Sequence, residues 1–411
     1  MEFRPVIFCM KISFDNTEYA FAYKTDGELK KARLLFSSMG LAWLVKIGTR
    51  LTPLVMKAGL PIKGILRNTI FRQFVGGETL EQTQPVANKL AKYNVDVILD
   101  YGVEGKEGEH NFDHAKDEFI KVIKYASSQP NIPFISVKLT GFCRFNLLAK
   151  LNSSISNYDA SKGVINTAKL TFVEKEEWNR VVSRMINICQ VALEGKVSVL
   201  IDAEESWIQA PVDALTIQMM KQFNHSDAVV YNTMQLYRHD RFEFMKLSYA
   251  DARSQGFIPA FKIVRGAYME KERKRASAMH YPSPIQIDKA ATDRDFNAAI
   301  EFAIENINNL RLIVASHNEY SNLYATNLIA AKTEMSEHPH VHFSQLYGMS
   351  DNITFNLAKA GLSVSKYLPF GPIKDVIPYL MRRAQENSSV SGQTGRELNL
   401  IEKELNRRKT A

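Results

Sequence analysis

The chain has 411 residues, of which 45% are hydrophobic and 23% are charged, a composition typical of a globular protein rather than a disordered one. Its formal net charge of +8 permits an anionic partner. No Lys/Arg-rich block with interleaved aromatic residues indicates a nucleic-acid surface. The three cysteines, Cys9, Cys143 and Cys189, form no CxxC motif, so we expect free thiols in a reducing cytoplasm.

The first 70 residues are predicted to form an N-terminal helical arm. The apolar run 5–10 is too short for a signal peptide or a membrane span, and one interpretation of residues 1–9 is an extension upstream of the natural start. Within residues 38–68, cations interrupt every apolar stretch, which excludes a transmembrane helix. We favour a pair of helices packed on the main domain. The alternative is a basic amphipathic surface that makes peripheral contact with the inner face of the membrane.

From about residue 70 onward, short apolar runs rich in β-branched residues alternate with longer helix-like segments. Each run has the length of a strand that is buried on both faces. There are eight such runs, at 95–101, 133–139, 197–201, 228–232, 260–264, 310–315, 340–345 and 363–368. Eight strands alternating with helices predict an α/β fold, a (βα)8 TIM-type barrel over residues 71–395. An open, doubly wound sheet is the alternative, and residues 396–411 are expected to form a basic tail.

A barrel of this kind places its chemistry at the C-terminal ends of the strands. Polar residues do collect at or after the end of each predicted strand, where several of them interrupt otherwise apolar runs. They are Asp100, Lys138, Asp202, Glu204, Gln235, Lys262, Arg265, Tyr268, Ser316, His317, Asn318, Gln345 and Tyr367. This distribution predicts one polar cavity at the mouth of the barrel.

Two adjacent arginines, Arg382 and Arg383, follow the eighth predicted strand, with Glu386 one helical turn beyond Arg382. Alone, this pattern is typical of a solvated ion pair on a helix. Two neighbouring guanidinium groups are also suited to binding one carboxylate, because each can donate two parallel hydrogen bonds. Basic residues near the predicted mouth therefore indicate a cationic cavity for carboxylate or phosphate groups: Lys138, Lys262, Arg265, Arg382 and Arg383.

Other sequence patterns exclude several kinds of site. No GxGxxG follows a predicted strand, and neither a P-loop nor an HExxH motif occurs, so a Rossmann-type nucleotide site is not supported. His338, His340 and His342 alternate as metal ligands on a strand can. However, they precede or open the seventh strand, at the end of a barrel that serves stability, so we expect no metal site there. Lys138 leaves open a Schiff-base aldolase on the same fold.

An ordered set of motifs resembles the proline dehydrogenase family, in its monofunctional bacterial and mitochondrial form. The resemblance covers roughly residues 70–395. Its motifs are FVGGE (74–78), ILDYGVE (98–104), VKLT (137–140), DAEE (202–205), KIVRGAY (262–268), ASHN (315–318), QLYGM (345–349), YLPFGP (367–372) and YLMRRAQENSS (379–389).

The resemblance implies non-covalent FAD at the mouth of a distorted barrel, oxidation of L-proline to 1-pyrroline-5-carboxylate, and electron transfer to a membrane quinone. It implies that Arg382, Arg383 and Lys138 bind the proline carboxylate, and that Tyr268, Leu346, Tyr367 and Tyr379 surround its ring. Asp202 would orient the site, and Lys262 would lie beside flavin N5. FAD would contact Ala203, Gln235, Lys262, Arg265, Gly266, Ala267, Ser316, His317, Asn318, Gln345 and Glu386. Glu386 would also pair with an active-site arginine and help to close the lid.

Three positions bear on how closely the resemblance holds. Lys262 stands where many family members have arginine, so the charge is kept but the planar fork is lost. Arg265, where others carry lysine, compensates in part. Tyr367 indicates proline as the substrate, because relatives that prefer hydroxyproline tend to have a smaller residue there. Besides the aldolase, a non-catalytic, membrane-associated scaffold resting on residues 38–68 is the remaining alternative.

Overall fold

The structure is a computed structural model that describes residues 12–41, 46, 63–102, 107–333, 337–389 and 393–410. The side chains of a few residues within these ranges, including Glu386, lie outside the described part. Residues 1–9 and most of residues 38–68 also lie outside the described part. The predicted upstream extension and the predicted amphipathic surface therefore fall largely outside the described residues. None of the described helices is both long and apolar enough to cross a membrane.

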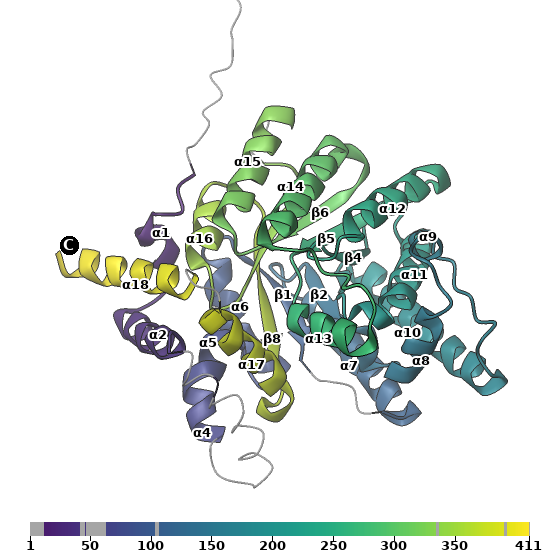
Figure 1. Cartoon of the computed structure of the whole chain (residues 1–411). Coiled ribbons are helices and arrows are strands. Elements are labelled where there is room, and N and C mark those ends of the chain that lie inside the picture. Colours follow the sequence, from purple (N-terminus) through teal and green to yellow (C-terminus); the bar gives the residue numbers. More distant parts are fainter. Residues whose placement is uncertain are drawn as a thin grey trace, which may run out of the picture.

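Eight parallel strands close into a barrel, which confirms the predicted fold and excludes the open sheet (Figure 1). Closure is made by β1 and β8, which pair along the whole length of β1 with Leu99 opposite Leu368. The strands are β1 (Asp96–Tyr101), β2 (Phe134–Val137), β3 (Ser198–Ile201), β4 (Val230–Gln235), β5 (Ala260–Val264), β6 (Arg311–Ala315), β7 (Val341–Leu346) and β8 (Val364–Phe370).

Helices surround the barrel and precede and follow it. The α-helices are α1 (Thr17–Phe21), α2 (Asp26–Met39), α4 (Lys63–Leu66), α5 (Arg72–Phe74), α6 (Leu80–Ala91), α7 (Glu109–Ser127), α8 (Phe145–Asn152), α9 (Asn157–Ser161), α10 (Phe172–Gly195), α11 (Ser206–Phe223), α12 (Arg241–Gln255), α13 (Met269–Met279), α14 (Lys289–Glu305), α15 (Glu319–Thr333), α16 (Asp351–Lys359), α17 (Ile373–Ser389) and α18 (Gln393–Thr410). The remaining described elements are a short π-helix, η1 (Arg67–Phe71), and two short 3₁₀ helices, η2 (Leu139–Gly141) and η3 (Ile307–Asn309).

Side chains that point inward fill the lower part of the barrel. A buried cluster takes one residue from each of six strands: Ile98, Phe134, Leu200, Tyr231, Ala260 and Ile313. This layer makes the interior a packed core rather than a pore. The polar residues at the other end of the strands therefore line a cavity that has a floor.

Three strands extend beyond their predicted ends. β4 was predicted to end at residue 232 and runs to Gln235, β7 runs to Leu346 instead of 345, and β8 runs to Phe370 instead of 368. The β4 prediction stopped where polar residues begin to alternate with apolar ones. The ladder continues because backbone hydrogen bonds do not depend on side-chain polarity, and Gln235 still pairs with Val264.

The two ends of the described chain pack together against one side of the barrel (Figure 1). Residues 396–411 were predicted to be a basic tail, but all except the last belong to α18. Leu400, Ile401 and Leu405 are buried in a second hydrophobic cluster with residues of α1 and α2. Arg396 pairs with Asp15 at 2.6 Å. The last segment is therefore part of the folded body, because its apolar residues recur at helical spacing.

Candidate active site

A cavity of about 710 Å³ lies at the C-terminal ends of the strands and receives residues from all eight of them or from the loops that directly follow. The predicted site residues that line it are Lys138, Asp202, Ala203, Gln235, Lys262, Arg265, Gly266, Ala267, Tyr268, Ser316, His317, Asn318, Gln345, Leu346, Tyr367, Tyr379, Arg382 and Arg383. Glu386 is the one predicted site residue whose side chain lies outside the described part. A cavity of this volume is within the range of sites that take a drug-sized ligand.

Asp202, directly after β3, is the centre of a buried ionic cluster. Its carboxylate accepts hydrogen bonds from the Lys262 ammonium and, at 2.8 Å, from the Tyr367 hydroxyl. The Lys138 ammonium lies 3.2 Å from Oδ2 of Asp202, the same oxygen that accepts from Tyr367, and 3.5 Å from Oδ1 of Asp100. Burial opposes the charge on Asp202, yet Lys262 and Lys138 hold the pKa of its carboxyl well below its usual range. The cluster therefore keeps three side chains from different strands in fixed positions.

The environment of Lys138 bears on the aldolase alternative. Burial alone would lower the pKa of its ammonium, but the carboxylates of Asp100 and Asp202 raise this pKa well above its usual range. A lysine that forms a Schiff base needs the opposite shift, because only the neutral amine is a nucleophile. Lys138 is thus suited to binding an anion and not to attacking a carbonyl.

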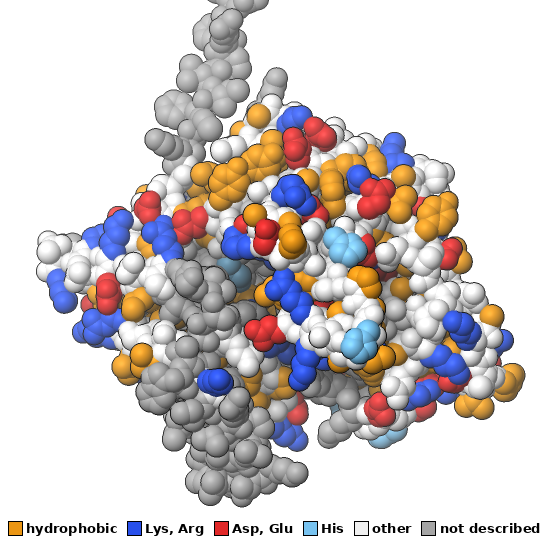
Figure 2. All heavy atoms as spheres, in the orientation of Figure 1, with side chains coloured by type: hydrophobic (Ala, Val, Ile, Leu, Met, Phe, Trp, Pro, Cys, Tyr) orange, Lys and Arg blue, Asp and Glu red, His pale blue; other side chains and the backbone are white. Residues whose placement is uncertain are grey.

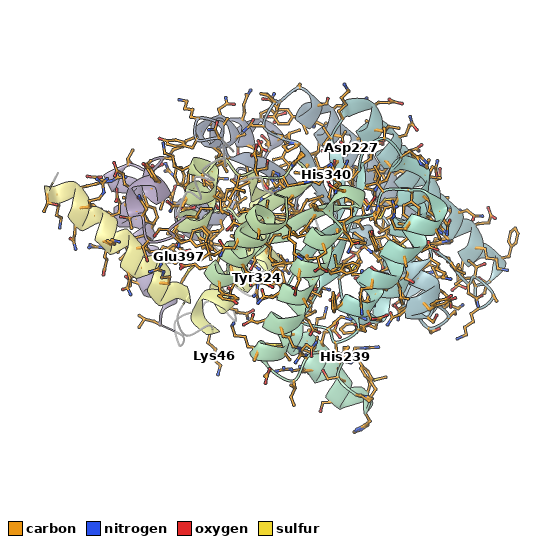
Figure 3. The ribbon with its side chains drawn as sticks, turned by 90° about the horizontal axis from the view of Figure 1, so that it is seen from above. Lys46, Asp227, His239, Tyr324, His340 and Glu397 are labelled. Carbon is orange, nitrogen blue, oxygen red and sulfur yellow. The ribbon has the colours of Figure 1, made fainter. Side chains whose placement is uncertain are left out.

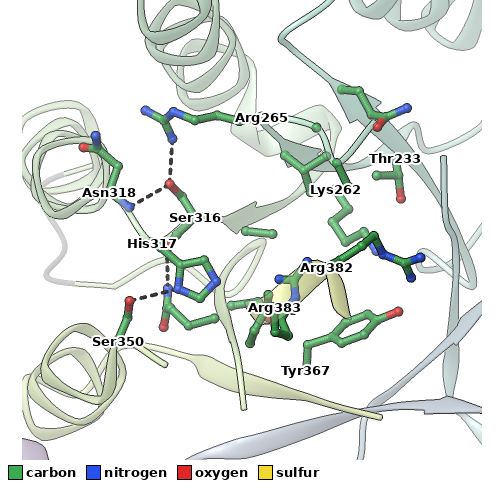
Figure 4. A pocket seen from close by; sticks show the side chains of 18 of the residues that line it. Thr233, Lys262, Arg265, Ser316, His317, Asn318, Ser350, Tyr367, Arg382 and Arg383 are labelled. Carbon is green, nitrogen blue, oxygen red and sulfur yellow. Dashed lines mark hydrogen bonds between the residues drawn. The ribbon is translucent and has the colours of Figure 1, made fainter. Parts of the chain in front are cut away.

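Helix α17 presents the two adjacent arginines to the cavity. Val376, Leu380 and Ala384 recur at helical spacing and are buried against the second hydrophobic cluster, so the opposite face is turned toward the barrel. Figure 4 shows Arg382 and Arg383 reaching into the space beside Lys262 and Tyr367. The side chain of Arg383 is only 6% exposed, so its charge is largely shielded from solvent.

Arg265 is bonded to the protein on three sides. Its Nε donates to Asp293 at 2.8 Å, and its two terminal nitrogens donate to Ser316 at 2.7 Å and Ser321 at 2.9 Å. Ser316 also accepts from the backbone N–H of Asn318 at 3.1 Å. The planar guanidinium therefore holds the loop after β6 in place at the cavity wall.

Gly266 follows with a φ of +129°, a conformation that favours glycine. A Cβ at this position would lie 2.4 Å from the ring of Tyr237. Both the backbone conformation of Gly266 and its packing against Tyr237 therefore exclude a side chain at this position.

His317 lies at the cavity wall with Nδ1 2.9 Å from the Ser350 hydroxyl (Figure 4). Burial, together with the positive charges of Lys366 and Arg383, lowers the pKa of this imidazole to about 3. The ring is therefore neutral at physiological pH. A neutral imidazole carries one N–H donor and one acceptor nitrogen.

The cavity as a whole is cationic. Seven basic side chains and four carboxylates line it, a formal balance of +3 among the described residues. The basic residues are Lys138, Lys262, Arg265, Lys289, Arg382, Arg383 and Arg396, and the acidic ones are Asp100, Asp202, Glu319 and Glu397. On the outer face shown in Figure 2, by contrast, basic and acidic side chains are interspersed. The excess of positive charge thus predicts a ligand with several negative charges in the cavity.

Several lining residues were not predicted from the sequence: Thr233, Val264, Lys289, Ala315, Glu319, Ser344, Ser350, Asn352, Arg396 and Glu397. Some of these residues, such as Val264 and Ala315, directly precede a predicted site residue in the sequence. Including the neighbours of each polar residue at a strand end would have identified them. Arg396 and Glu397 lie on α18, labelled in Figure 3 at Glu397, and no local pattern connects that helix with the barrel.

The three alternating histidines form no metal site. The His338 and His340 rings pack against each other, and His340 Nδ1 contacts the Ile307 carbonyl oxygen at 2.8 Å. The half-buried His342 ring packs edge-on against Phe134, and loss of solvent around the imidazole lowers its pKa to about 3. In the described part of the chain, no three or more His, Cys, Asp or Glu side chains are grouped so that they could hold a metal ion.

Comparisons with known proteins agree with this arrangement. Among solved structures, proline utilization A of Bdellovibrio bacteriovorus matches 94% of this chain with a TM-score of 0.69 at 20% identity, and a Bradyrhizobium japonicum form matches 95% with 0.64 at 18%. The chain spans only 38% and 43% of those proteins, so this likeness concerns the fold.

Sequence relatives are more similar. Carbapenem antibiotics biosynthesis protein CarD of Pectobacterium carotovorum subsp. carotovorum is 32% identical over 84% of this chain and 86% of its own. Mitochondrial proline dehydrogenase 1 of Dictyostelium discoideum is 30% identical over 97% of this chain and 75% of its own. Hydroxyproline dehydrogenase of Xenopus laevis is 30% identical over 94% and 88%. The family model of proline dehydrogenase matches residues 83–396. This chain therefore belongs to the proline dehydrogenase family.

Proposed function

We propose that this protein oxidises L-proline to 1-pyrroline-5-carboxylate with non-covalently bound FAD and passes the electrons to a quinone, as the first step of proline degradation. Membership of the family and the names of relatives from Dictyostelium, Caenorhabditis and Arabidopsis support the reaction. The observation that carries the proposal is the cationic cavity, in which two arginines of α17 lie beside the cluster of Lys138, Asp202, Lys262 and Tyr367. Residues 71–395 would form the catalytic barrel.

The residues of the cavity fit FAD. The formal excess of three positive charges matches a pyrophosphate with two negative charges plus one substrate carboxylate. Ser316, the backbone around Gly266 and the neutral His317 supply polar groups suited to phosphate oxygens. The residues that would hold the cofactor are Ala203, Gln235, Lys262, Arg265, Gly266, Ala267, Ser316, His317, Asn318, Gln345 and Glu386.

Proline would bind with its carboxylate between Arg382 and Arg383, assisted by Lys138. The shielded charge of Arg383 favours a strong charge-assisted hydrogen bond. The ring would be enclosed by Tyr268, Leu346, Tyr367 and Tyr379. Tyr367 is fixed by its hydrogen bond to Asp202, so its ring fills space that the hydroxyl of a hydroxyproline would need. Proline is therefore the favoured substrate over hydroxyproline.

When bound, FAD supplies the N5 atom that accepts a hydride from proline C5. The protein residues orient the substrate for this step, since fixing the carboxylate at two points fixes C5 relative to the cofactor. Proline must lose its amine proton before C5 and nitrogen can form the imine double bond, and the cationic cavity favours the neutral amine. Asp202 holds Lys262 in the cavity, where the positive charge of the ammonium would stabilise the negative charge that the cofactor gains on reduction.

The quinone acceptor and a peripheral contact with the inner face of the membrane are further parts of the proposal. The membrane contact would involve residues 38–68, most of which lie outside the described residues. Flotation of the full chain with liposomes, compared with a variant in which Lys46, Arg50 and Lys57 are replaced by glutamine, tests this contact. Equal flotation of the wild type and the variant would contradict the membrane contact.

The activity itself is tested by flavin analysis and dye reduction. We expect purified protein to release FAD on heat denaturation, and to reduce an artificial electron acceptor with L-proline but not with D-proline. A protein without flavin that is inactivated by borohydride in the presence of a carbonyl substrate would instead support the aldolase and refute the proposal.

A further inference from the structure

Ser350 lies at the start of α16 but does not cap this helix with its side chain. A serine at this position usually accepts a hydrogen bond from a backbone N–H of the first turn. Here the hydroxyl lies 2.9 Å from Nδ1 of His317 instead. The helix thus lacks its ordinary cap, and the hydroxyl contacts a residue of the cavity wall.

The backbone of Ser350 is strained. Its φ of +51° lies in the left-handed region, which residues other than glycine seldom occupy. The backbone N–H of Ser350 donates to the carboxylate of Glu397, which reaches it from α18. Glu397 is buried, 5% exposed, and is held in place by packing of α18 against α1 and α2. A residue 47 positions away therefore maintains a conformation that directs the Ser350 hydroxyl toward His317.

The contact between Ser350 and His317 permits two proton arrangements. If Nδ1 carried the proton, it would donate a hydrogen bond to the Ser350 hydroxyl oxygen. The hydroxyl proton would then have no acceptor among the described residues. If Nδ1 is unprotonated, the hydroxyl donates to it and both groups are satisfied. The second arrangement leaves the proton of the neutral ring on Nε2, which points away from Ser350 and into the space that Arg383 also enters (Figure 4).

We infer that Ser350 and Glu397 are positioning residues that fix His317 as the Nε2–H tautomer, so that His317 donates a hydrogen bond to an anionic oxygen of the ligand. The identity of that ligand, the pyrophosphate of FAD, rests on the proposed function. α18 thereby takes part in cofactor binding through Ser350 and His317. Three observations support this positioning role. The Ser350 side chain does not cap α16, the Ser350 backbone is strained, and the buried Glu397 accepts a hydrogen bond from the Ser350 N–H.

The tautomer is measured directly by NMR of the full-length protein labelled with ¹⁵N-histidine, with and without added FAD. The His317 signals are assigned by their loss in His317→Gln. We expect the wild type to show a protonated Nε2 and an unprotonated Nδ1 in both samples. We expect Ser350→Ala and Ser350→Gly to show a mixture of tautomers. A protonated Nδ1 in the wild type, or an unchanged tautomer in Ser350→Gly, would overturn the inference.

The same two variants separate the hydroxyl from the backbone strain. Glycine adopts a positive φ without strain, whereas alanine keeps the strain, and both remove the hydroxyl. If the hydroxyl acts through His317, both variants release FAD from the holoenzyme about threefold to tenfold faster, the range for one neutral hydrogen bond. If only the backbone conformation of Ser350 matters, Ser350→Gly releases FAD at the rate of the wild type, and the inference fails.

Glu397 is tested with a matched control on the same helix. Glu397→Ala should shift the His317 tautomer and speed FAD release, whereas Glu397→Gln, which keeps an acceptor for the Ser350 N–H, should do so less. Glu402→Gln alters an exposed residue of α18 and should change neither. Adding Ser350→Gly to His317→Gln should have no further effect on FAD release. A protein that binds no flavin refutes the proposed function, whereas a flavin-binding protein with the Nδ1–H tautomer refutes this inference alone.

Discussion

Replacing Arg383 by alanine removes a cation that is only 6% exposed and that lies 5.1 Å from the ring of Tyr379. Because solvent does not screen this charge, its hydrogen bonds to a substrate carboxylate should have the strength of charge-assisted bonds, about 1.5–3 kcal/mol each. With Arg382 still present to hold part of the carboxylate, the loss should be about 2–4 kcal/mol in kcat/KM. This corresponds to a decrease of about 30-fold to 900-fold.

The loss should appear mainly as a higher KM, because the carboxylate is bound in the ground state and in the transition state alike. Arg382→Ala should cost less, since Arg382 is more exposed than Arg383. The assay is steady-state dye reduction at varied L-proline concentration, with FAD content measured on each preparation. Arg253→Ala, which removes an exposed arginine of α12, is the control and should match the wild type. Activity of Arg383→Ala within twofold of the wild type, at normal FAD content, would refute the reasoning.

Three further predictions follow from the same structure. Tyr367→Ser should shift the ratio of kcat/KM for hydroxyproline over proline upward by about tenfold, because it opens space beside Asp202; an unchanged ratio would contradict the assigned wall. With L-proline, kcat/KM should rise from about pH 6 to pH 9 as the substrate amine loses its proton, and a flat profile would count against a neutral amine. Burial raises the pKa of Glu204 to about 7. Since this pKa lies above that of the unfolded chain, the contribution of Glu204 to stability is lost as pH rises from about 5 to 7, by about 3 kcal/mol. Urea unfolding of Glu204→Gln should lack that decrease, and an equal decrease in both proteins would show that Glu204 is not its source.

The fold was predictable because each buried strand is a short apolar run, and eight such runs alternate with helical segments. The mouth of the barrel was predictable for a related reason. A polar residue that ends an apolar run, such as Asp202 after β3, lines the cavity, whereas Glu204, two residues further on, accepts hydrogen bonds from Thr140 instead. The end of β4 was missed because Thr233 and Gln235 interrupt the apolar run, and the end of β8 because Pro369 is a residue that strands rarely contain.

The contribution of α18 could not be predicted in the same way. Its place depends on contacts between residues far apart in the chain, such as Arg396 with Asp15, and charge composition alone suggested a tail. The spacing of its buried residues Leu400, Ile401 and Leu405 indicates an amphipathic helix, but not the surface on which it packs. The partner of Gly266, Tyr237, was likewise invisible, because sequence shows that a glycine is present and not what would collide with a side chain.

The central claim is that the cavity holds a flavin that L-proline reduces. Its most direct test is the absorbance spectrum of the purified protein under anaerobic conditions, before and after addition of L-proline, with D-proline as the control. We predict a flavin band that L-proline bleaches and that D-proline leaves unchanged. Protein without a flavin band, or with a band that L-proline does not bleach, would contradict the claim.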